Sequence, residues 1–241
     1  PLRISILKNV VTVGLDSTGT SLHKRGYRKY TAPAPVTETL AAALLLLSPW
    51  KKDRILVDPF CGSGTILIEA AMIAMNIAPG MNREFTAEGW TNLIPKKEWY
   101  SVVEEASDLM EEEAEVNIQG YDIDGEVLKM ARANAALAGV DKQIHFQQRD
   151  IINFSSPKKY GFVISNPPYG ERLSSKKEME LLYRTIGNII RENETWSFFL
   201  LSGFEEAQKA IGKKATKNRK IYNGMMKTYL YQYMGTKPPR H

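Results

Sequence analysis

The chain has 241 residues, of which 43% are hydrophobic, and this is enough for one α/β domain with a substantial core. No apolar run is long enough to cross a membrane, and a single cysteine, Cys61, excludes an internal disulfide. The net charge of +5 comes from two basic ends around an acidic middle. With only one cysteine, a cytoplasmic protein is the simpler expectation, and we expect no membrane span. His23, His145 and His241 are far apart and lack ligand spacing to the cysteine, so we expect no bound metal.

Residues 1–30 form the first unit along the chain. Alternating apolar and polar residues over 2–15, interrupted by Lys8-Asn9, predict a two-stranded hairpin, and a turn-rich basic stretch follows. Residues 31–35 contain two prolines and predict a rigid extended linker. The chain opens on Pro1 instead of methionine, so we expect a further segment upstream.

The next part of the chain alternates strands and helices. Thr37 or a neighbour can cap an apolar helix that ends before Pro49. Strands are predicted at 54–57, 119–123, 143–148, 162–165 and 196–201, and helices at 65–76, 125–138, 177–192 and 205–211. This alternation predicts a doubly wound, Rossmann-like parallel sheet.

Two segments depart from that alternation. The interval 77–118 is longer than a simple connection, and we expect an insertion near the active face, with its acidic run as the solvated face of a helix. The chain closes with strands at 217–221 and 225–234. Asn223-Gly224 between them predicts an antiparallel hairpin with a type I′ turn.

A glycine-bearing turn, residues 58–65, joins the first sheet strand to the helix behind it. Gly62 and Gly64 let the backbone approach a ligand that lies across the strand ends, and the helix N-terminus favours an anion. No lysine follows the last glycine, which disfavours a phosphate-binding P-loop. Leu67 stands where a dinucleotide-binding fingerprint has its third glycine, so a nicotinamide dinucleotide site is weakly supported as well. A purely structural turn remains an alternative.

Acidic residues follow the next two strands. Asp122 can accept two hydrogen bonds from ribose hydroxyls. Asp124 could do the same or could cap the helix that starts at Gly125. Asp150 could accept an adenine amino hydrogen or cap its own loop.

Asn166-Pro167-Pro168-Tyr169 ends a short apolar strand. The prolines hold the backbone extended, so its carbonyls stay free to accept hydrogen bonds. Asn166 adds an amide and Tyr169 a flat face, which together suit a planar ring with an exocyclic amino group. This description fits a nucleobase better than a sugar or a lipid, although a turn of this kind could also simply end a strand.

In this order the motifs resemble S-adenosylmethionine-dependent amino methyltransferases. Segments 22–28, 78–85 and 166–173 are similar to one branch, the THUMP-domain RNA guanine-N2 methyltransferases, whose members are often labelled N6-adenine DNA methylases. The resemblance covers essentially residues 20–235. It implies a class I methyltransferase sheet over 31–241 and S-adenosyl-L-methionine as cofactor. Residues 1–30 would then be the trailing hairpin or connector of a THUMP region that is mostly absent.

The resemblance also implies roles for single residues. Asp58, Gly62 and Gly64 would hold the methionine part of the cofactor, Asp122 its ribose and Asp150 its adenine, and segment 31–38 resembles the family's N-terminal cofactor-binding motif. The implied cofactor-binding residues are Thr37, Glu38, Asp58, Phe60, Gly62, Gly64, Thr65, Asp122, Ile123, Asp150, Ile151 and Asn166. The implied catalytic residues are Asn166, Pro167, Pro168 and Tyr169.

The expected reaction is methylation of an exocyclic amine of an RNA base, guanine N2 in large-subunit ribosomal RNA. The same turn also serves adenine-N6 enzymes and protein glutamine-N5 enzymes, and a non-catalytic RNA-binding module is a further alternative. Cytosine-C5 methylation needs a cysteine beside the base, whereas Cys61 lies in the cofactor loop. The basic ends contain interleaved tyrosines, which fits a nucleic-acid surface or, for the C-terminal stretch alone, a lysine-rich edge that prevents strand pairing.

Overall fold

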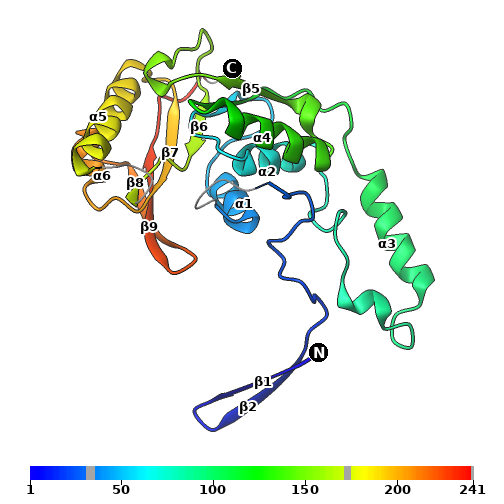
Figure 1. Cartoon of the computed structure of the whole chain (residues 1–241). Helices are drawn as coiled ribbons and strands as arrows, with labels where there is room; N and C mark the ends of the chain where they lie inside the picture. Colours follow the sequence, from blue (N-terminus) through cyan, green and yellow to red (C-terminus); the bar gives the residue numbers. More distant parts are fainter. Residues whose placement is uncertain (31–35, 171–174, 240–241) are drawn as a thin grey trace.

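The computed structural model describes residues 1–30, 36–170 and 175–239. Its centre is a seven-stranded sheet in the order β5-β4-β3-β6-β7-β9-β8 (Figure 1). The strands are β3 (Leu56–Asp58), β4 (Ile118–Asp122), β5 (Ile144–Gln148), β6 (Phe162–Ser165), β7 (Ser197–Ser202), β8 (Lys217–Asn223) and β9 (Met226–Tyr233). The helices are α1 (Glu38–Leu46), α2 (Thr65–Ala74), α3 (Lys96–Asp108), α4 (Gly125–Leu137), α5 (Lys176–Glu192) and α6 (Ala207–Ile211).

The sheet is doubly wound. Strands β3 to β7 are parallel to their neighbours, and β9 is antiparallel to both β7 and β8. The chain starts in the middle at β3, goes outward to β4 and β5, and then crosses back to β6. The predicted Rossmann-like sheet with a C-terminal antiparallel hairpin is therefore confirmed, and the strand order reverses between β3 and β6, where such folds bind ligands.

Helices cover both faces of the sheet. Residues of α1, α2 and α4 share one buried apolar cluster with the strands, and residues of α5 and α6 share the other. Helix α2 is apolar on nearly all sides, and nine of its ten residues are buried because it lies between the sheet and α1. The predicted bounds of these sheet elements agree with the structure to within two residues.

The turn of the C-terminal hairpin differs from the prediction. Asn223 still pairs with Met226, so the turn residues are Gly224 and Met225. Only Gly224 has a positive φ, of 60°. A positive φ at the first turn position alone indicates a type II′ turn, and the predicted type I′ turn at Asn223-Gly224 is wrong by one residue.

A second hairpin, β1 (Leu2–Leu7) and β2 (Val10–Leu15), extends away from the sheet (Figure 1). Its turn residues Lys8 and Asn9 both have positive φ, 48° and 64°, as a type I′ turn requires. The N-terminal hairpin is thus confirmed. The predicted linker at 31–35 lies outside the described residues.

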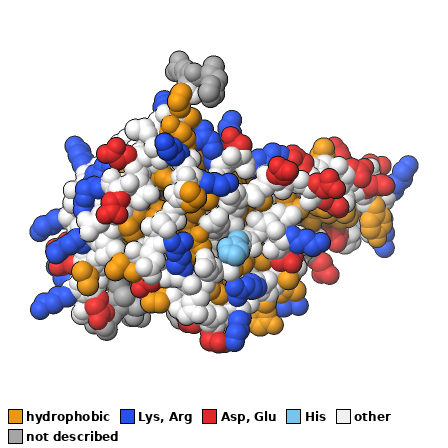
Figure 2. Space-filling model, turned by 90° about the horizontal axis from the view of Figure 1, so that it is seen from above, with side chains coloured by type: hydrophobic (Ala, Val, Ile, Leu, Met, Phe, Trp, Pro, Cys, Tyr) orange, Lys and Arg blue, Asp and Glu red, His pale blue; other side chains and the backbone are white. Residues whose placement is uncertain are grey.

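The insertion 77–118 contains a short 3-10 turn, η1 (Thr86–Gly89), and α3. It leaves the end of α2 and returns to the start of β4, so both attachment points lie at the edge where the parallel strands begin. The expectation that it is attached near the active face is wrong, because the site residues follow the strand ends. No residue of α3 is buried, and acidic side chains gather over this arm (Figure 2). The solvated acidic helix face is confirmed for Glu104, Glu105 and Asp108, whereas the acidic residues at 111–113 and 115 follow the end of α3 and are not helical.

Two findings concern other functional classes. Within the described ranges, no helix combines the length and apolarity needed to span a bilayer. Nor do three or more His, Cys, Asp or Glu side chains come together there as a metal site.

Candidate active site

Strand register brings the motifs to one edge of the sheet. Asp58 pairs with Gly120 of β4, and Asp122 pairs with Gln148 of β5. Strand β6, which leads into Asn166, runs beside β3. The residues that follow β3, β4, β5 and β6 therefore lie along the edge where the parallel strands end.

The glycine-bearing turn is tied to the end of β4. Gly62 N donates to Asp122 Oδ2 at 3.0 Å, and Cys61 N donates to the Tyr121 carbonyl at 2.9 Å. Gly62 has a φ of 52°, and a Cβ at this position would meet nothing within 4 Å. Its side therefore faces open space, so the backbone is accessible to a ligand, as predicted.

Close packing explains the other glycine of this turn. A Cβ on Gly64, whose φ is 84°, would lie 3.2 Å from the Ala131 Cβ. On the neighbouring strand, a Cβ on Gly120 would lie only 2.5 Å from the Leu67 Cδ1. Leu67, at the position where a dinucleotide fingerprint has glycine, thus fills space that glycine leaves free in β4.

Asp58 is buried at the start of the turn. Its Oδ1 accepts hydrogen bonds from Phe60 N at 3.1 Å and from the Ser165 hydroxyl. Burial raises the pKa of Asp58 to about 7, while these two hydrogen bonds lower it and the charge of Asp122 raises it further. The Ser165 bond also joins the end of β3 to the residue before Asn166.

Asn166 is buried beside this bond. Its Oδ1 has no hydrogen-bond partner among the described residues. An unpaired buried amide oxygen costs free energy, so it is a position where a ligand donor is expected.

Tyr169 is 9% exposed and packs in the same cluster as Tyr183 and Phe204. A Cβ on Gly203 would lie 2.9 Å from the Tyr169 ring, so glycine permits this packing. The ring therefore offers a base much less open area than the sequence suggested. Pro167 is buried and Pro168 half-buried, and residues 171–173 of the same motif lie outside the described part of the chain.

The three acids after β4 and β5 differ in their use. Asp122 accepts from Gly62 N with one oxygen and from Asp124 N, at 3.1 Å, with the other. Each carboxylate oxygen keeps acceptor capacity for a ribose hydroxyl. Asp124 accepts from Glu126 N at 2.8 Å and so caps α4. Asp150 accepts from Ile152 N at 3.0 Å, so its side chain caps a 3-10 turn, η3 (Ile151–Asn153), in this structure.

Apolar side chains flank these acids. Ile123 is 67% exposed directly after Asp122, and Ile151 is half-buried after Asp150. An exposed isoleucine at a strand end suits contact with a planar ring.

The start of α1 provides a second buried oxygen. Thr37 stands at the N-cap, but its side chain makes no cap hydrogen bond. Glu38 is buried, and its Oε1 lies 3.1 Å from Arg28 Nε, whereas its Oε2 has no hydrogen-bond partner among the described residues. Arg28 also donates to Thr65 Oγ1 at 3.0 Å, which links the starts of α1 and α2.

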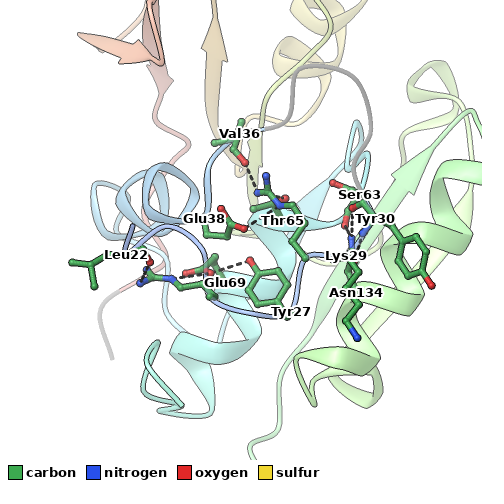
Figure 3. A network of polar contacts seen from close by, with 12 residues as sticks. Leu22, Tyr27, Lys29, Tyr30, Val36, Glu38, Ser63, Thr65, Glu69 and Asn134 are labelled. Atoms are coloured by element: carbon green, nitrogen blue, oxygen red, sulfur yellow. Dashed lines mark hydrogen bonds and ion pairs between the residues drawn. The ribbon is translucent and has the colours of Figure 1, made fainter. Parts of the chain in front are cut away.

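Segment 22–30, here called the strap, lies over α2 and is held by buried polar contacts (Figure 3). Tyr27 donates to Glu69 Oε1 at 3.0 Å, and Arg25 Nε lies 3.6 Å from the same oxygen. Asn134 of α4 accepts from Tyr30 N at 3.2 Å and donates to the Ser63 carbonyl at 3.2 Å. The strap and the glycine-bearing turn are therefore joined through one amide.

Four residues of this site had no assigned role in the sequence. Asn134 and Glu69 are buried and Arg28 is half-buried in the strap network, and Ser165 links two strand ends. Glu69 stands among the apolar residues of α2, and Asn134 stands among alanines on the buried face of α4. This was a usable signal, because a polar residue there must find a partner.

Cys61, the only cysteine, is buried. Burial raises the pKa of the Cys61 thiol well above its usual value, and the charges of Asp58 and Asp122 add to the shift. A thiol in this state is a poor nucleophile, which supports setting cytosine-C5 chemistry aside.

A comparison with family models matches residues 25–232 to the RMKL-like methyltransferase domain. The protein named as a candidate RNA methyltransferase, YpsC of Bacillus subtilis (strain 168), is 44% identical over 99% of this chain and 62% of its own length. The ribosomal RNA large subunit methyltransferase K/L of Shewanella pealeana is 41% identical over 90% of this chain and 31% of its own length. The chain thus spans less than two thirds of either relative.

Three solved structures are similar over nearly the whole chain. A possible methylase from Clostridium difficile 630 has a TM-score of 0.94 at 50% identity, with 100% of this chain and 63% of that chain covered. SMU.472, a candidate methyltransferase complexed with SAH, has a TM-score of 0.92 at 42% identity, with 99% of this chain and 62% of that chain covered. A predicted N6-adenine-specific DNA methylase from Listeria monocytogenes has a TM-score of 0.91 at 47% identity, with 98% of this chain and 60% of that chain covered.

Proposed function

This chain belongs to the RMKL-like methyltransferase domain family, and we propose that it methylates an exocyclic amino group of an RNA base with S-adenosyl-L-methionine as donor. The proposed target is guanine N2 in large-subunit ribosomal RNA. The name of the Shewanella relative supports the ribosomal substrate, and the SAH complex of SMU.472 supports the cofactor. The division into residues 1–30 and 31–241 stays a prediction.

The residues at the strand ends fit this cofactor. Asp122 has free acceptor capacity for ribose hydroxyls, and exposed Ile123 beside it can contact the adenine. Glu38 Oε2 is a buried acceptor without a partner among the described residues, and it suits the ammonium of the methionine part. Asp122 would add negative charge to the site, and Asp58, with a pKa of about 7, would be partly ionised at neutral pH. The cap that Asp150 makes leaves its second oxygen for an adenine amino group.

One observation carries the proposed chemistry: the unpartnered Oδ1 of buried Asn166 at the end of β6. When bound, the cofactor supplies an activated methyl group on a positively charged sulfur. Asn166 Oδ1 and the Pro167 carbonyl accept the two hydrogens of the target amine. These bonds localise the nitrogen lone pair and aim it along the line of transfer.

The proton is lost after transfer. As the new N–C bond forms, the electron pair of the broken S–C bond goes to sulfur, and the amine nitrogen becomes positive. Asn166 cannot take up the extra proton because an amide is not basic, so the proton leaves to solvent. The residues therefore position and polarise the amine, and no side-chain base is required.

The test is methyl transfer by the full chain to large-subunit ribosomal RNA from a strain that lacks the gene, followed by mass spectrometry of nucleosides. The wild-type chain should restore N2-methylguanosine. Asn166→Ala should lower the rate about 10²- to 10³-fold, as removal of a transition-state hydrogen bond does elsewhere. Calorimetry should give a cofactor affinity close to wild type for that variant.

A matched control is Asn188→Ala, which removes an exposed amide from α5. It should leave the rate unchanged. An unchanged rate in Asn166→Ala would remove Asn166 from the mechanism.

The second candidate is adenine-N6 methylation, which the description of the Listeria structure favours. The same nucleoside analysis separates the two, because restoration of N6-methyladenine in place of N2-methylguanosine would assign that reaction. A chain that binds RNA and methylates neither base would be the non-catalytic binding module.

A further inference from the structure

The C-terminal hairpin carries two lysines and two tyrosines on one of its faces. The register of β8 and β9 pairs Lys220 with Tyr229 and Tyr222 with Lys227. Residues two apart on a strand point to the same side, so all four share one face. We call Lys220, Tyr222, Lys227 and Tyr229 the Lys–Tyr patch.

Within the patch each ammonium group lies over a ring. Lys220 Nζ is 5.1 Å from the centroid of the Tyr222 ring, and Lys227 Nζ is 5.4 Å from that of Tyr229. Both lysines and Tyr222 are exposed, and Tyr229 is half-buried. Lysines and tyrosines therefore alternate on this solvent-facing surface. Each tyrosine has one lysine next to it on its own strand and another paired with it on the neighbouring strand.

The patch lies at the edge of the sheet that holds the candidate active site. Ser202, the last residue of β7, pairs with Tyr229, and β9 extends from there to Met226, about 10 Å past the end of β7. Figure 1 shows the hairpin turn projecting beyond the sheet.

Contacts connect this end of the hairpin to the catalytic turn. A Cβ on Gly203 would lie 2.9 Å from the Tyr169 ring and 3.3 Å from Met226 Sδ, so both side chains flank the same glycine. Tyr229 also packs against the apolar cluster that contains Tyr169. Tyr229 thus packs on the same side of the sheet as Tyr169, so an RNA strand with its target base at Asn166 can extend toward the patch.

Protection of a sheet edge explains only part of this surface. Strand β8 is the edge strand, and lysines on an edge discourage pairing with other chains. That accounts for Lys217, Arg219 and Lys220. It does not account for Lys227, which is on the inner strand β9 and lies over Tyr229.

We propose that the Lys–Tyr patch binds the single-stranded RNA next to the target nucleotide. Its tyrosines would stack with flanking bases, and its lysines would meet the phosphates between them. A base has to leave its helix to reach Asn166, so its neighbours are unpaired and available for stacking. This inference rests on the proposed function for the choice of RNA.

The experiment measures binding of the full chain to a fluorescein-labelled single-stranded 12-nucleotide RNA by anisotropy over a range of salt concentrations. The test variant is Lys220→Ala/Lys227→Ala. The control is Lys217→Ala/Arg219→Ala, which removes the same charge from exposed positions on the opposite face of the same hairpin. Tyr222→Ala tests stacking separately.

The patch variant should bind more weakly, and the slope of log affinity against log salt should be shallower by about 1.4, for two lost phosphate contacts. The control should change affinity much less. Tyr222→Ala should lower affinity about tenfold without changing the slope.

Equal losses of RNA affinity in the patch variant and the control would overturn the inference, because they would indicate a general effect of positive charge. No loss of RNA affinity in either variant would overturn it as well.

Methyl transfer to ribosomal RNA is followed in parallel. A wild-type chain that transfers no methyl group, while only the patch variant loses RNA binding, would refute the proposed function and support the patch. A patch variant that binds and methylates as wild type does would refute the patch alone.

Discussion

Asp58 should make the stability of this protein depend on pH in an unusual direction. Asp58 is 1% exposed, and burial raises its pKa to about 7 from the ordinary value of 3.8. Because the folded pKa lies above the unfolded one, the stabilising contribution is complete below about pH 4 and is lost as pH rises to about 7. A shift of this size corresponds to about 4 kcal/mol in total, of which about 2 to 3 kcal/mol falls between pH 5 and pH 8.

The informative substitution is Asp58→Asn, because the amide has the same shape and cannot ionise. Its Oδ1 can still accept from Phe60 N and the Ser165 hydroxyl. From pH 5 to pH 8 the variant should therefore gain about 2 to 3 kcal/mol of unfolding free energy relative to wild type. Urea unfolding followed by circular dichroism at the two pH values measures this difference.

Asp141→Asn is the control, since it removes a carboxylate from an exposed position. Its stability relative to wild type should change by less than about 0.5 kcal/mol between the two pH values. If Asp58→Asn shows no more change than this control, then Asp58 does not titrate in that range. That result would refute a pKa near 7 for buried Asp58.

Two further predictions concern the cofactor and the packing of the sheet. Asp122→Ala should weaken S-adenosylmethionine binding about 10- to 100-fold, because it removes the ribose acceptor and the anchor of Gly62 N; an unaltered dissociation constant in calorimetry would reassign the ribose contact. Gly120→Ala should destabilise the fold by about 1–3 kcal/mol, because its Cβ would lie 2.5 Å from the Leu67 Cδ1. Gly89→Ala, whose Cβ meets nothing within 4 Å, is the matched control, and equal unfolding midpoints for the two variants would contradict the packing argument.

Most of the architecture could be predicted from the sequence because its signals are local. Short apolar runs followed by acids, glycines or Asn-Pro-Pro mark strand ends, and alternating helices require those ends to share an edge. The insertion was recognised by its length, but its point of attachment was not. That point depends on the direction of α2, which returns the chain to the far edge of the sheet.

The candidate site was predictable for residues that stand directly at strand ends. The motif order brought Asp58, Asp122 and Asn166 into one hypothesis, and the structure brings them to one edge. The availability of Tyr169 was overestimated, since only the folded chain shows its ring packed beside Gly203. The position of Asp124 before Gly125 predicted a helix cap as one of two roles, and the structure shows that the side chain takes this role.

The sequence by itself determined the order of strands and helices, and it placed the glycine-bearing turn and Asn166 at strand ends. These follow from backbone rules that act over a few residues. Only the tertiary structure decided that Ser165 bonds Asp58, that Asn134 joins the strap to Ser63, and that the Tyr169 ring packs beside Gly203. Such contacts join residues far apart in the chain, and strand register and packing, which no local pattern encodes, determine which of them meet.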